Sequence, residues 1–251
     1  MKTSDSFNSL APIDFRYFDE EVSQYLSDRA YLNYKLKVEV ALVKTLAKQK
    51  ICSAQVVNEV EKAASQVTPE EVDTEEEKVK HDIRAMVNVI RSKVSDEAKP
   101  YVHMTATSYD IIDTANAARF RDVTQKVLIP ALKGLEKVLI LLAEKEAKTV
   151  QVGRTHGQHA VPITFGYAIA GYVSRLGQSM LALEALSKEL RGKFSGAVGA
   201  YNASSLFFDE PEVFERDVLA EMGLEAGEQA TQVVQPEPMT RLLAEATITA
   251  G

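Results

Sequence analysis

The sequence predicts an all-α protein, with a small helical N-terminal domain in residues 1–100 followed by part of a long-helix bundle in residues 101–251. Three observations support this prediction. Apolar residues recur at three- and four-residue spacing along most of the chain, and capping residues stand before several of these segments. Two periodic segments of about 40 and 30 residues flank one short corner, a pattern typical of an antiparallel bundle. Apolar stripes of this length usually need more partners than a small monomer supplies, so we expect oligomerisation.

In the N-terminal domain, the apolar spacing predicts a helix from about residue 27 to residue 49. Ser53 is a suitable N-cap for a second helix. Thr68 and Pro69 open a third, because proline suits the first turn and acidic residues follow near the positive end of the helix dipole. The pattern breaks at residues 96–100, and we place the domain boundary there.

The bundle domain begins with Thr107, Ser108 and Asp110, which stand directly before a long apolar-periodic run. These residues predict the N-terminal cap of a very long helix, in which Pro130 predicts a kink. Unpaired N–H groups and two hydroxyls gather at such a helix start. It is therefore either a plain cap or a seat for a carboxylate.

A polar corner, residues 150–166, separates the two long segments. Gly153 and Gly157 allow a sharp turn that leaves peptide N–H groups facing outward. Pro162 suits the first turn of the next helix, which the apolar spacing predicts over residues 163–191. Two shorter helical patterns follow, at residues 212–222 and at the end of the chain, where the pattern is still running at residues 246–250.

The corner also contains His156 and His159, two of only four histidines. A histidine beside a helix start, with an unperturbed pKa of about 6.5, exchanges a proton at neutral pH. The alternative is a structural role in which both rings bond backbone carbonyls. A helical zinc pair is usually spaced i, i+4 with a glutamate between, and this pair lacks both features, so we expect no metal.

The composition limits the class of protein. Hydrophobic residues make up 45% and charged residues 26%, an ordinary globular balance. The net charge of −7 and the lack of long Lys/Arg blocks argue against binding to nucleic acid or to a membrane surface. The single cysteine, Cys52, excludes an intrachain disulfide and fits a reducing compartment. With no apolar signal core and no long apolar run, we expect a cytoplasmic protein.

Three segments together carry a family resemblance. They resemble, in order and separation, the successive motifs of the fumarase/aspartase superfamily, and most closely those of its adenylosuccinate lyase family. The segments are Lys80-His81-Asp82, then Thr107-Ser108-Tyr109-Asp110 with His103 before it, then Gly153-Arg154-Thr155-His156-Gly157-Gln158 with Pro162 behind it. The resemblance spans the chain from Arg16 to Gln232.

The resemblance implies an all-α homotetramer without a cofactor, whose active sites are each built from three subunits. It also implies a small nucleotide substrate and a β-elimination: adenylosuccinate is cleaved to AMP and fumarate, and the matching succinyl ribotide of purine biosynthesis is cleaved in the same way. By position, His156 resembles the general acid that protonates the departing nitrogen. Thr107 and Ser108 resemble the hydroxyls that hold the succinyl carboxylates.

The other carried-over positions are substrate-binding residues. Gln232 resembles a substrate-binding glutamine, and Thr155 belongs to the same motif as His156. Arg16 and Tyr17 resemble the pair at the nucleotide phosphate. A further set resembles the residues that line or lie near the nucleotide: Lys80, His81, Asp82, His103 and His159.

The chain also departs from the family pattern. Thr105 stands where glycine is common, and Gln235-Pro236-Glu237-Pro238 replaces an arginine-bearing segment that bears on nucleotide specificity. The Gly-Ser-Ser loop that supplies the catalytic base does not occur, so we expect a fragment that is inactive alone. The alternatives are a sister fumarate-releasing lyase and a non-catalytic helical oligomer; the retained His156, Thr107 and Ser108 argue against the latter.

Overall fold

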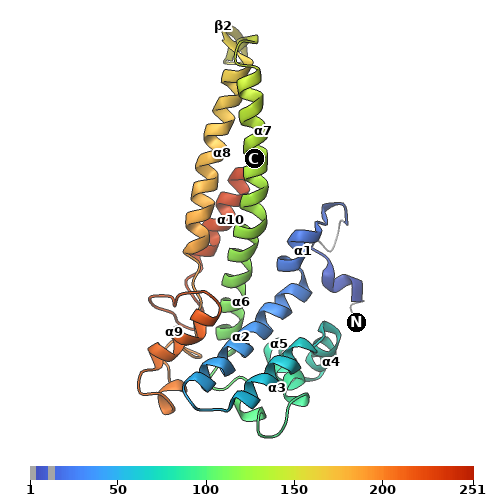
Figure 1. Ribbon diagram of the computed structural model, residues 1–251, viewed down its shortest axis with the longest axis vertical. Helices are drawn as coiled ribbons and strands as arrows, with labels where there is room; N and C mark the ends of the chain where they lie inside the picture. The colour runs from blue at the N-terminus through green and yellow to red at the C-terminus, as the bar shows by residue number, and fades with distance from the viewer. Residues whose placement is uncertain (1–3, 11–14) are drawn as a thin grey trace. The chain divides into compact units, whose positions relative to one another are not determined.

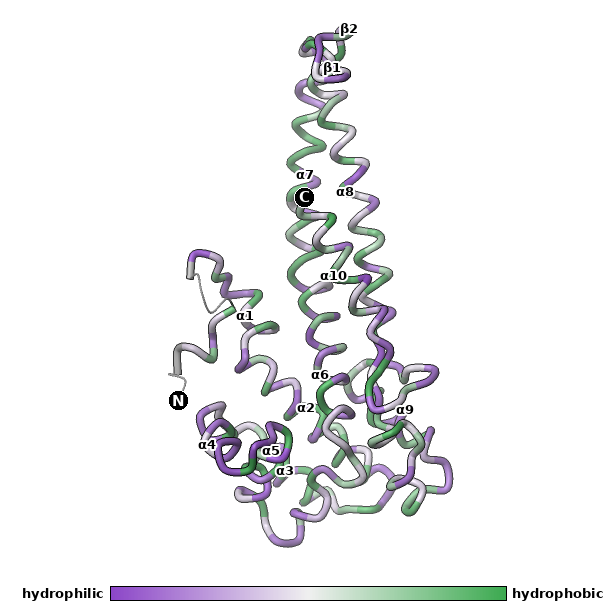
Figure 2. Tube along the Cα trace, turned by 180° about the vertical axis from the view of Figure 1, so that it is seen from behind, coloured by the Kyte–Doolittle hydropathy of each residue, from purple (hydrophilic) through white to green (hydrophobic). Residues whose placement is uncertain are grey.

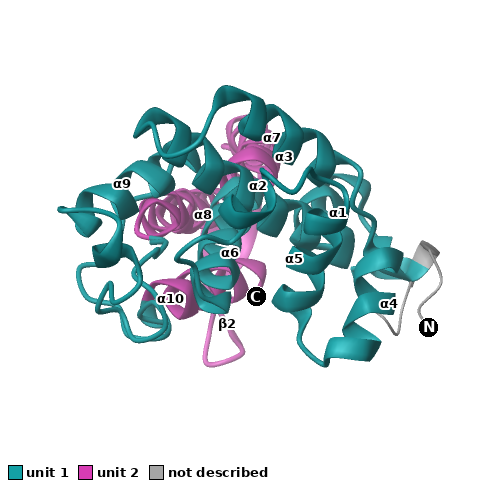
Figure 3. Ribbon diagram, turned by 90° about the horizontal axis from the view of Figure 1, so that it is seen from below, with its two compact units in different colours: residues 1–123, 190–237 teal, residues 124–189, 238–251 magenta. Residues whose placement is uncertain are grey.

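A computed structural model describes residues 4–10 and 15–251 of the chain. These residues form helices along most of their length, together with one short β-hairpin. They divide into two compact units, shown in different colours in Figure 3. Unit 1 contains residues 1–123 and 190–237, and unit 2 contains residues 124–189 and 238–251. The domain boundary near residue 100 stays a prediction.

Unit 1 is organised around the helix α2 (Figure 1). Helices α1, α3, α6 and α9 pack against α2, and α4 packs against α5. Val38, Leu42, Val43 and Leu46 of α2 have no exposed surface, so this helix supplies much of the core. The helices of unit 1 are α1 (Glu20–Leu26), α2 (Asp28–Lys48), α3 (Ala54–Ser65), α4 (Pro69–Val79), α5 (Asp82–Ser92), α6 (Ser108–Val123) and α9 (Pro211–Glu221), with short 3₁₀ turns η1 (Ser4–Asn8), η2 (Phe15–Tyr17), η3 (Lys99–Tyr101) and η5 (Ser204–Leu206).

The predicted helix starts in unit 1 are confirmed at two caps. The Ser53 hydroxyl accepts from the N–H of Val56 at 3.4 Å and caps α3. Thr68 and Glu71 form a reciprocal capping box at the start of α4, with Pro69 in its first turn. These local hydrogen bonds satisfy N–H groups that the helix itself leaves unpaired.

Unit 2 is a pair of long helices, α7 (Ile129–Lys145) and α8 (Phe165–Lys188), which run side by side in opposite directions (Figure 1). Most of α10 (Glu237–Ala250) belongs to the same unit. A π-helical turn, Thr124–Leu128, stands directly before α7, whose second residue is Pro130. The interruption predicted at this proline therefore takes the form of a π turn.

The prediction that residues 150–166 form a corner between two helices is wrong. The strands β1 (Val150–Thr155) and β2 (Gln158–Thr164) form an antiparallel hairpin, in which Pro162 faces Val152. Pro162 is tolerated because both strands of a two-stranded ribbon are edges. Helix α8 begins only at Phe165, where the Thr164 hydroxyl accepts from the N–H of Tyr167 at 3.1 Å.

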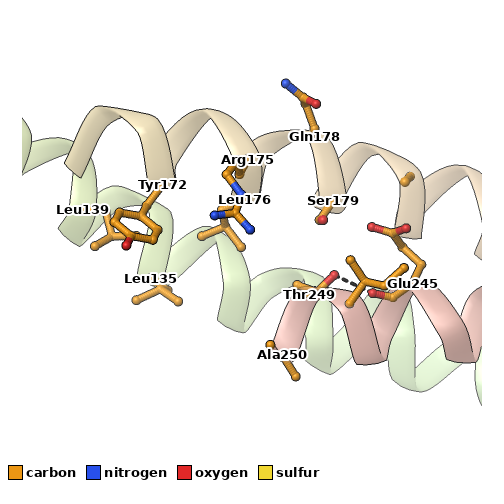
Figure 4. A pocket seen from close by; sticks show the side chains of 13 residues that line it. Leu135, Leu139, Tyr172, Arg175, Leu176, Gln178, Ser179, Glu245, Thr249 and Ala250 are labelled. Atoms are coloured by element: carbon orange, nitrogen blue, oxygen red, sulfur yellow. Dashed lines mark hydrogen bonds between the residues drawn. The ribbon is translucent and has the colours of Figure 1, made fainter. Parts of the chain in front are cut away.

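Unit 2 exposes many apolar side chains. Figure 2 shows hydrophobic residues along α7, and Val138, Leu141 and Leu181 are 61%, 57% and 70% exposed. Between α7, α8 and α10 lies an open groove of about 690 Å³, in which Leu135, Leu139, Tyr172 and Leu176 line one side and Glu245 and Thr249 the other (Figure 4).

Candidate active site

Two residues one turn apart on α2, Lys35 and Glu39, hold two of the predicted site segments. Lys35 Nζ lies 2.9 Å from Asp82 Oδ2. Glu39 accepts the backbone N–H of His103 at 2.9 Å, and its Oε1 lies 2.7 Å from His103 Nδ1. Positions four residues apart share a helix face, so the structure brings Asp82 and His103 to one face of α2.

The electrostatics of these two pairs fix their charges. Burial acts to raise the pKa of Asp82, but the hydrogen bond and charge of Lys35 outweigh it, and the net pKa is lowered. Burial acts to lower the pKa of His103, but the charge of Glu39 and its hydrogen bond outweigh it, and the net pKa is raised. Asp82 is thus anionic at neutral pH, and His103 keeps its proton to a higher pH than a free histidine.

His81 caps the helix α5. Its Nδ1 accepts from the backbone N–H of Arg84 at 3.3 Å, so a neutral ring carries its proton on Nε2. Lys80 ends α4 in the left-handed conformation, with a φ of 57°, and its side chain is exposed. The two residues are therefore placed at a tight junction between α4 and α5.

The predicted cap at the start of α6 is formed differently from the prediction. The Asp110 carboxylate reaches back and accepts from the backbone N–H of Thr107 at 2.8 Å. Within the described part of the chain, the hydroxyls of Thr107 and Ser108 make no hydrogen bond. The helix start consequently presents two hydroxyls that a ligand carboxylate could engage.

Asp110 is itself held by a buried lysine. Asp110 and Lys193 have no exposed side-chain surface, and the Lys193 ammonium contacts Asp110 Oδ1. The backbone N–H of Gly196 lies 3.2 Å from each carboxylate oxygen. Burial raises the pKa of Asp110, while the Lys193 ammonium and these N–H groups stabilise its charged form.

The segment that carries Gln232 lies against the same helix. Asp113 of α6 accepts the backbone N–H of Val234 at 2.7 Å. Gly199, with a φ of 73°, approaches so closely that a Cβ there would stand 2.0 Å from the carbonyl oxygen of Ala230. Unit 1 thus places the start of α6, the glycine-rich loop and the Gln232 segment together.

Two buried hydroxyls beside these elements lack partners. The oxygens Oγ1 of Thr105 and Oγ of Ser195 have no hydrogen bond within residues 4–10 and 15–251. Ser195 is 2% exposed. An unsatisfied buried hydroxyl is uncommon in a native protein, and a ligand or water at the site would account for it.

His156 stands at the tip of the hairpin in unit 2. His156 and Gly157 are the two turn residues, with φ of 50° and 70°, between the paired Thr155 and Gln158. The predicted position beside a helix start is wrong, because the seven residues of β2 separate the turn from α8. Thr155, His156 and His159 are exposed.

Arg16 and Tyr17 belong to η2 (Phe15–Tyr17), and both side chains are exposed. Their role at the nucleotide phosphate stays a prediction.

Three further residues of this region, Lys35, Glu39 and Lys193, were not predicted from the sequence. A charged pair at i, i+4 inside the apolar pattern of α2 was a detectable signal for the first two, whereas nothing in the local pattern indicates that Lys193 is buried.

In the described residues, no group of three or more His, Cys, Asp or Glu side chains is arranged to hold a metal ion. Across the same residues, each helix is too short or too polar to cross a membrane.

Comparison with known proteins places this arrangement among lyases. A family described as Lyase matches residues 15–248. The chain is 37% identical over 236 residues to an adenylosuccinate lyase of Pyrococcus horikoshii, covering 92% of this chain and 51% of that protein. It is 35% identical over 224 residues to an adenylosuccinate lyase of Archaeoglobus fulgidus, covering 89% of this chain and 49% of that protein.

Solved structures share the fold. A fumarate lyase from Mesorhizobium sp. BNC1 matches with a TM-score of 0.81 and 26% identity, over 95% of this chain and 56% of that one. A 3-carboxy-cis,cis-muconate lactonizing enzyme from Pseudomonas putida matches with a TM-score of 0.85 and 25% identity, over 94% of this chain and 54% of that one. The chain spans about half the length of the curated relatives it matches.

Proposed function

The chain belongs to this lyase family and has the fold of the fumarase/aspartase superfamily, and from that premise we propose that the protein carrying it cleaves adenylosuccinate to AMP and fumarate. The same site would cleave the matching succinyl ribotide of purine biosynthesis. One observation supports the proposal above the others: the start of α6 presents Thr107 and Ser108 with hydroxyls that no protein group occupies in the described chain.

The chemistry requires a site that binds the succinyl carboxylates. A base takes the proton next to a succinyl carboxylate, a role to which no residue of this chain is assigned. Removal of this proton builds additional negative charge on the substrate, and only interactions that strengthen with this charge accelerate the step. Unpaired N–H groups at the first turn of α6 and two hydroxyls supply donors for it. Thr107 and Ser108 are therefore assigned to the succinyl carboxylates.

The departing nitrogen requires an acid. As the C–N bond breaks, its electron pair goes to nitrogen, which leaves as the amine of AMP once it is protonated, and the new C=C bond is that of fumarate. A histidine suits this role because its pKa lies near neutral pH. His156 is assigned as this general acid, with Thr155 and Gln232 as substrate-binding residues.

The nucleotide is assigned to the remaining positions. Asp82, held anionic by Lys35, offers an acceptor to sugar hydroxyls or to the base, and His81 has its Nε2 free of the cap bond. Arg16 and Lys80 are cations suited to phosphate. Tyr17 and His103 complete the proposed contact set.

We propose a cytoplasmic homotetramer that binds neither nucleic acid nor membrane. The exposed apolar residues of α7 and α8 support association of further copies along these helices. The net charge of −7 opposes binding to nucleic acid.

The test is release of fumarate from adenylosuccinate, followed with the wild type and with Thr107→Ala/Ser108→Ala. Because neither hydroxyl caps α6, the double variant should lose substrate affinity with little loss of stability. Ser53→Ala is the matched control, since it removes a real cap and should cost about 1 kcal/mol without changing turnover. A double variant that loses stability but keeps binding and turnover would reduce the pair to a structural cap.

A second candidate is a sister lyase that releases fumarate from another succinyl substrate. The segment Gln235-Pro236-Glu237-Pro238, which leads into α10, favours it, because this segment lacks the arginine of the family pattern. Turnover of adenylosuccinate compared with other succinyl amines separates the two candidates. A protein that cleaves none of them supports a non-catalytic helical oligomer.

A further inference from the structure

Lys193 is a buried lysine that the proposed mechanism does not use. Its ammonium donates to the carbonyl oxygen of Gly196 at 2.9 Å and contacts Asp110 Oδ1. Its backbone is fixed as well, because Thr114 Oγ1 accepts the N–H of Lys193 at 3.1 Å and donates to its carbonyl oxygen at 2.9 Å. Every polar group of this residue is thus engaged by α6 or by the adjoining loop.

The contacts come from one face of α6. Asp110 and Thr114 are four residues apart and both have no exposed surface. The neighbouring Gly192 allows the close approach, since a Cβ at this position would lie 2.9 Å from Thr114 Oγ1 and 2.5 Å from Leu219 Cδ2. The loop at residues 192–196 is therefore tied to the first two turns of α6.

Asp110 also connects this loop to the carboxylate seat. Its Oδ2 accepts the N–H of Thr107, so the same carboxylate binds the seat, the Lys193 ammonium and the Gly196 N–H. A buried carboxylate without a partner would be poorly solvated, and the Lys193 ammonium stabilises the charged form of Asp110. Removal of the ammonium should release the turn at Thr107.

We propose that Lys193 and Asp110 are positioning residues, whose ion pair holds the Thr107-Ser108 turn in the geometry that binds a dicarboxylate. The proposal rests on the proposed function and adds residues that do not touch the substrate. It predicts a specific defect: the dicarboxylate part of the substrate is bound poorly, while the nucleotide part is bound normally.

The experiment measures fumarate and AMP affinities separately by calorimetry on the protein carrying this chain. Lys193→Met should weaken fumarate binding about tenfold or more, because small displacements of binding groups are costly, and should leave AMP affinity within about twofold. Tyr34→Phe is the matched control, since it removes another buried hydrogen bond to α6, from Tyr34 to Asp122, at the opposite end of the helix. It should lower the melting temperature without changing either affinity.

Lys193→Met/Asp110→Asn covers the case in which the single variant does not fold, because it removes both charges of the buried pair and leaves neither without its partner. The double variant should still bind fumarate weakly. Amide hydrogen exchange at residues 107–110 is a second readout, and it should be faster in both variants than in Tyr34→Phe. A folded variant with wild-type fumarate affinity and unchanged exchange overturns the inference. Wild-type protein that binds neither ligand contradicts the proposed function instead, and exchange then decides the inference alone.

Discussion

His103 Nδ1 lies 2.7 Å from Oε1 of Glu39, a carboxylate that has no exposed surface. The same carboxylate accepts the His103 backbone N–H, although the two residues are 64 positions apart in the sequence. His103 also occupies the left-handed region, with a φ of 63°. The ion pair therefore fixes both the backbone and the charge of a residue that stands four positions before Thr107.

This pair predicts a pH-dependent stability. Glu39 raises the folded-state pKa of His103. The contribution of this ion pair to folding stability is therefore fully present below the unfolded pKa of about 6.5, and it is lost as the pH rises through the raised folded-state pKa. Glu39→Gln should be less stable than the wild type by about 1–3 kcal/mol at pH 6, and the difference should shrink above neutral pH. Urea unfolding between pH 5.5 and 9 measures it. The charge of nearby Asp110 also raises the pKa of His103, and the charge of Arg91 lowers it. A stability difference that stays constant across this pH range would show that His103 does not titrate as described.

Thr105 is strained. It adopts a φ of 62°, which a β-branched residue rarely takes, and its Oγ1 is buried without a partner in the described chain. Thr105→Gly should raise the free energy of unfolding by about 1 kcal/mol, because relief of strain exceeds the entropy that glycine costs.

Thr105→Ala separates strain from desolvation, since it removes the hydroxyl and keeps a Cβ. Denaturant midpoints should rank the glycine variant above the alanine variant. The reverse order would show that the left-handed backbone costs little at this position.

Two glycines of α8 make a matched pair. A Cβ on Gly166 would stand 2.3 Å from the carbonyl oxygen of Ala143 and 2.7 Å from the backbone nitrogen of Ala147, both backbone atoms of the opposing segment. Gly166→Ala should therefore destabilise the protein by about 2–3 kcal/mol. A Cβ on Gly171 meets nothing within 4 Å, so Gly171→Ala should stabilise it by about 0.5–1 kcal/mol. Thermal unfolding of both variants measures the contrast, and equal effects would mean that the two helices are not packed as described.

The sequence was most informative where structure is local. Ser53 and Thr68 cap helices by contacts within one turn, so their residue types alone predict α3 and α4. The hairpin at Val150–Thr164 was missed because Gly157 and Pro162 suit both a helix corner and a turn.

Long-range pairs were beyond local reasoning. Lys193 contacts Asp110 across 83 positions, and no spacing rule links them. Asp110 was correctly placed at the start of α6, but its contact with Lys193 depends on where the chain returns after unit 2. The motifs of the resemblance predict which residues bind the substrate, and the structure shows which buried charges hold the segments of Asp82, His103 and Thr107.

The assignment of His156 leads to the last prediction. At a φ of 50° beside Gly157, this residue occupies a hairpin turn that accepts asparagine, whereas alanine would strain it. His156→Asn therefore removes the imidazole and retains the turn, which makes it a sharper test than His156→Ala. Loss of the general acid should lower kcat on adenylosuccinate by about two to four orders of magnitude, with a smaller change in KM.

Circular dichroism and thermal unfolding of the variant distinguish a lost acid from a misplaced hairpin. A lost general acid lowers kcat in a variant whose helical content and melting temperature match those of the wild type. A misplaced hairpin would lower the melting temperature as well. Near-normal turnover in a well-folded His156→Asn protein would remove His156 from the mechanism, and the proton for the departing nitrogen would then have to come from another group of the site, with His81 and its free Nε2 the first to test.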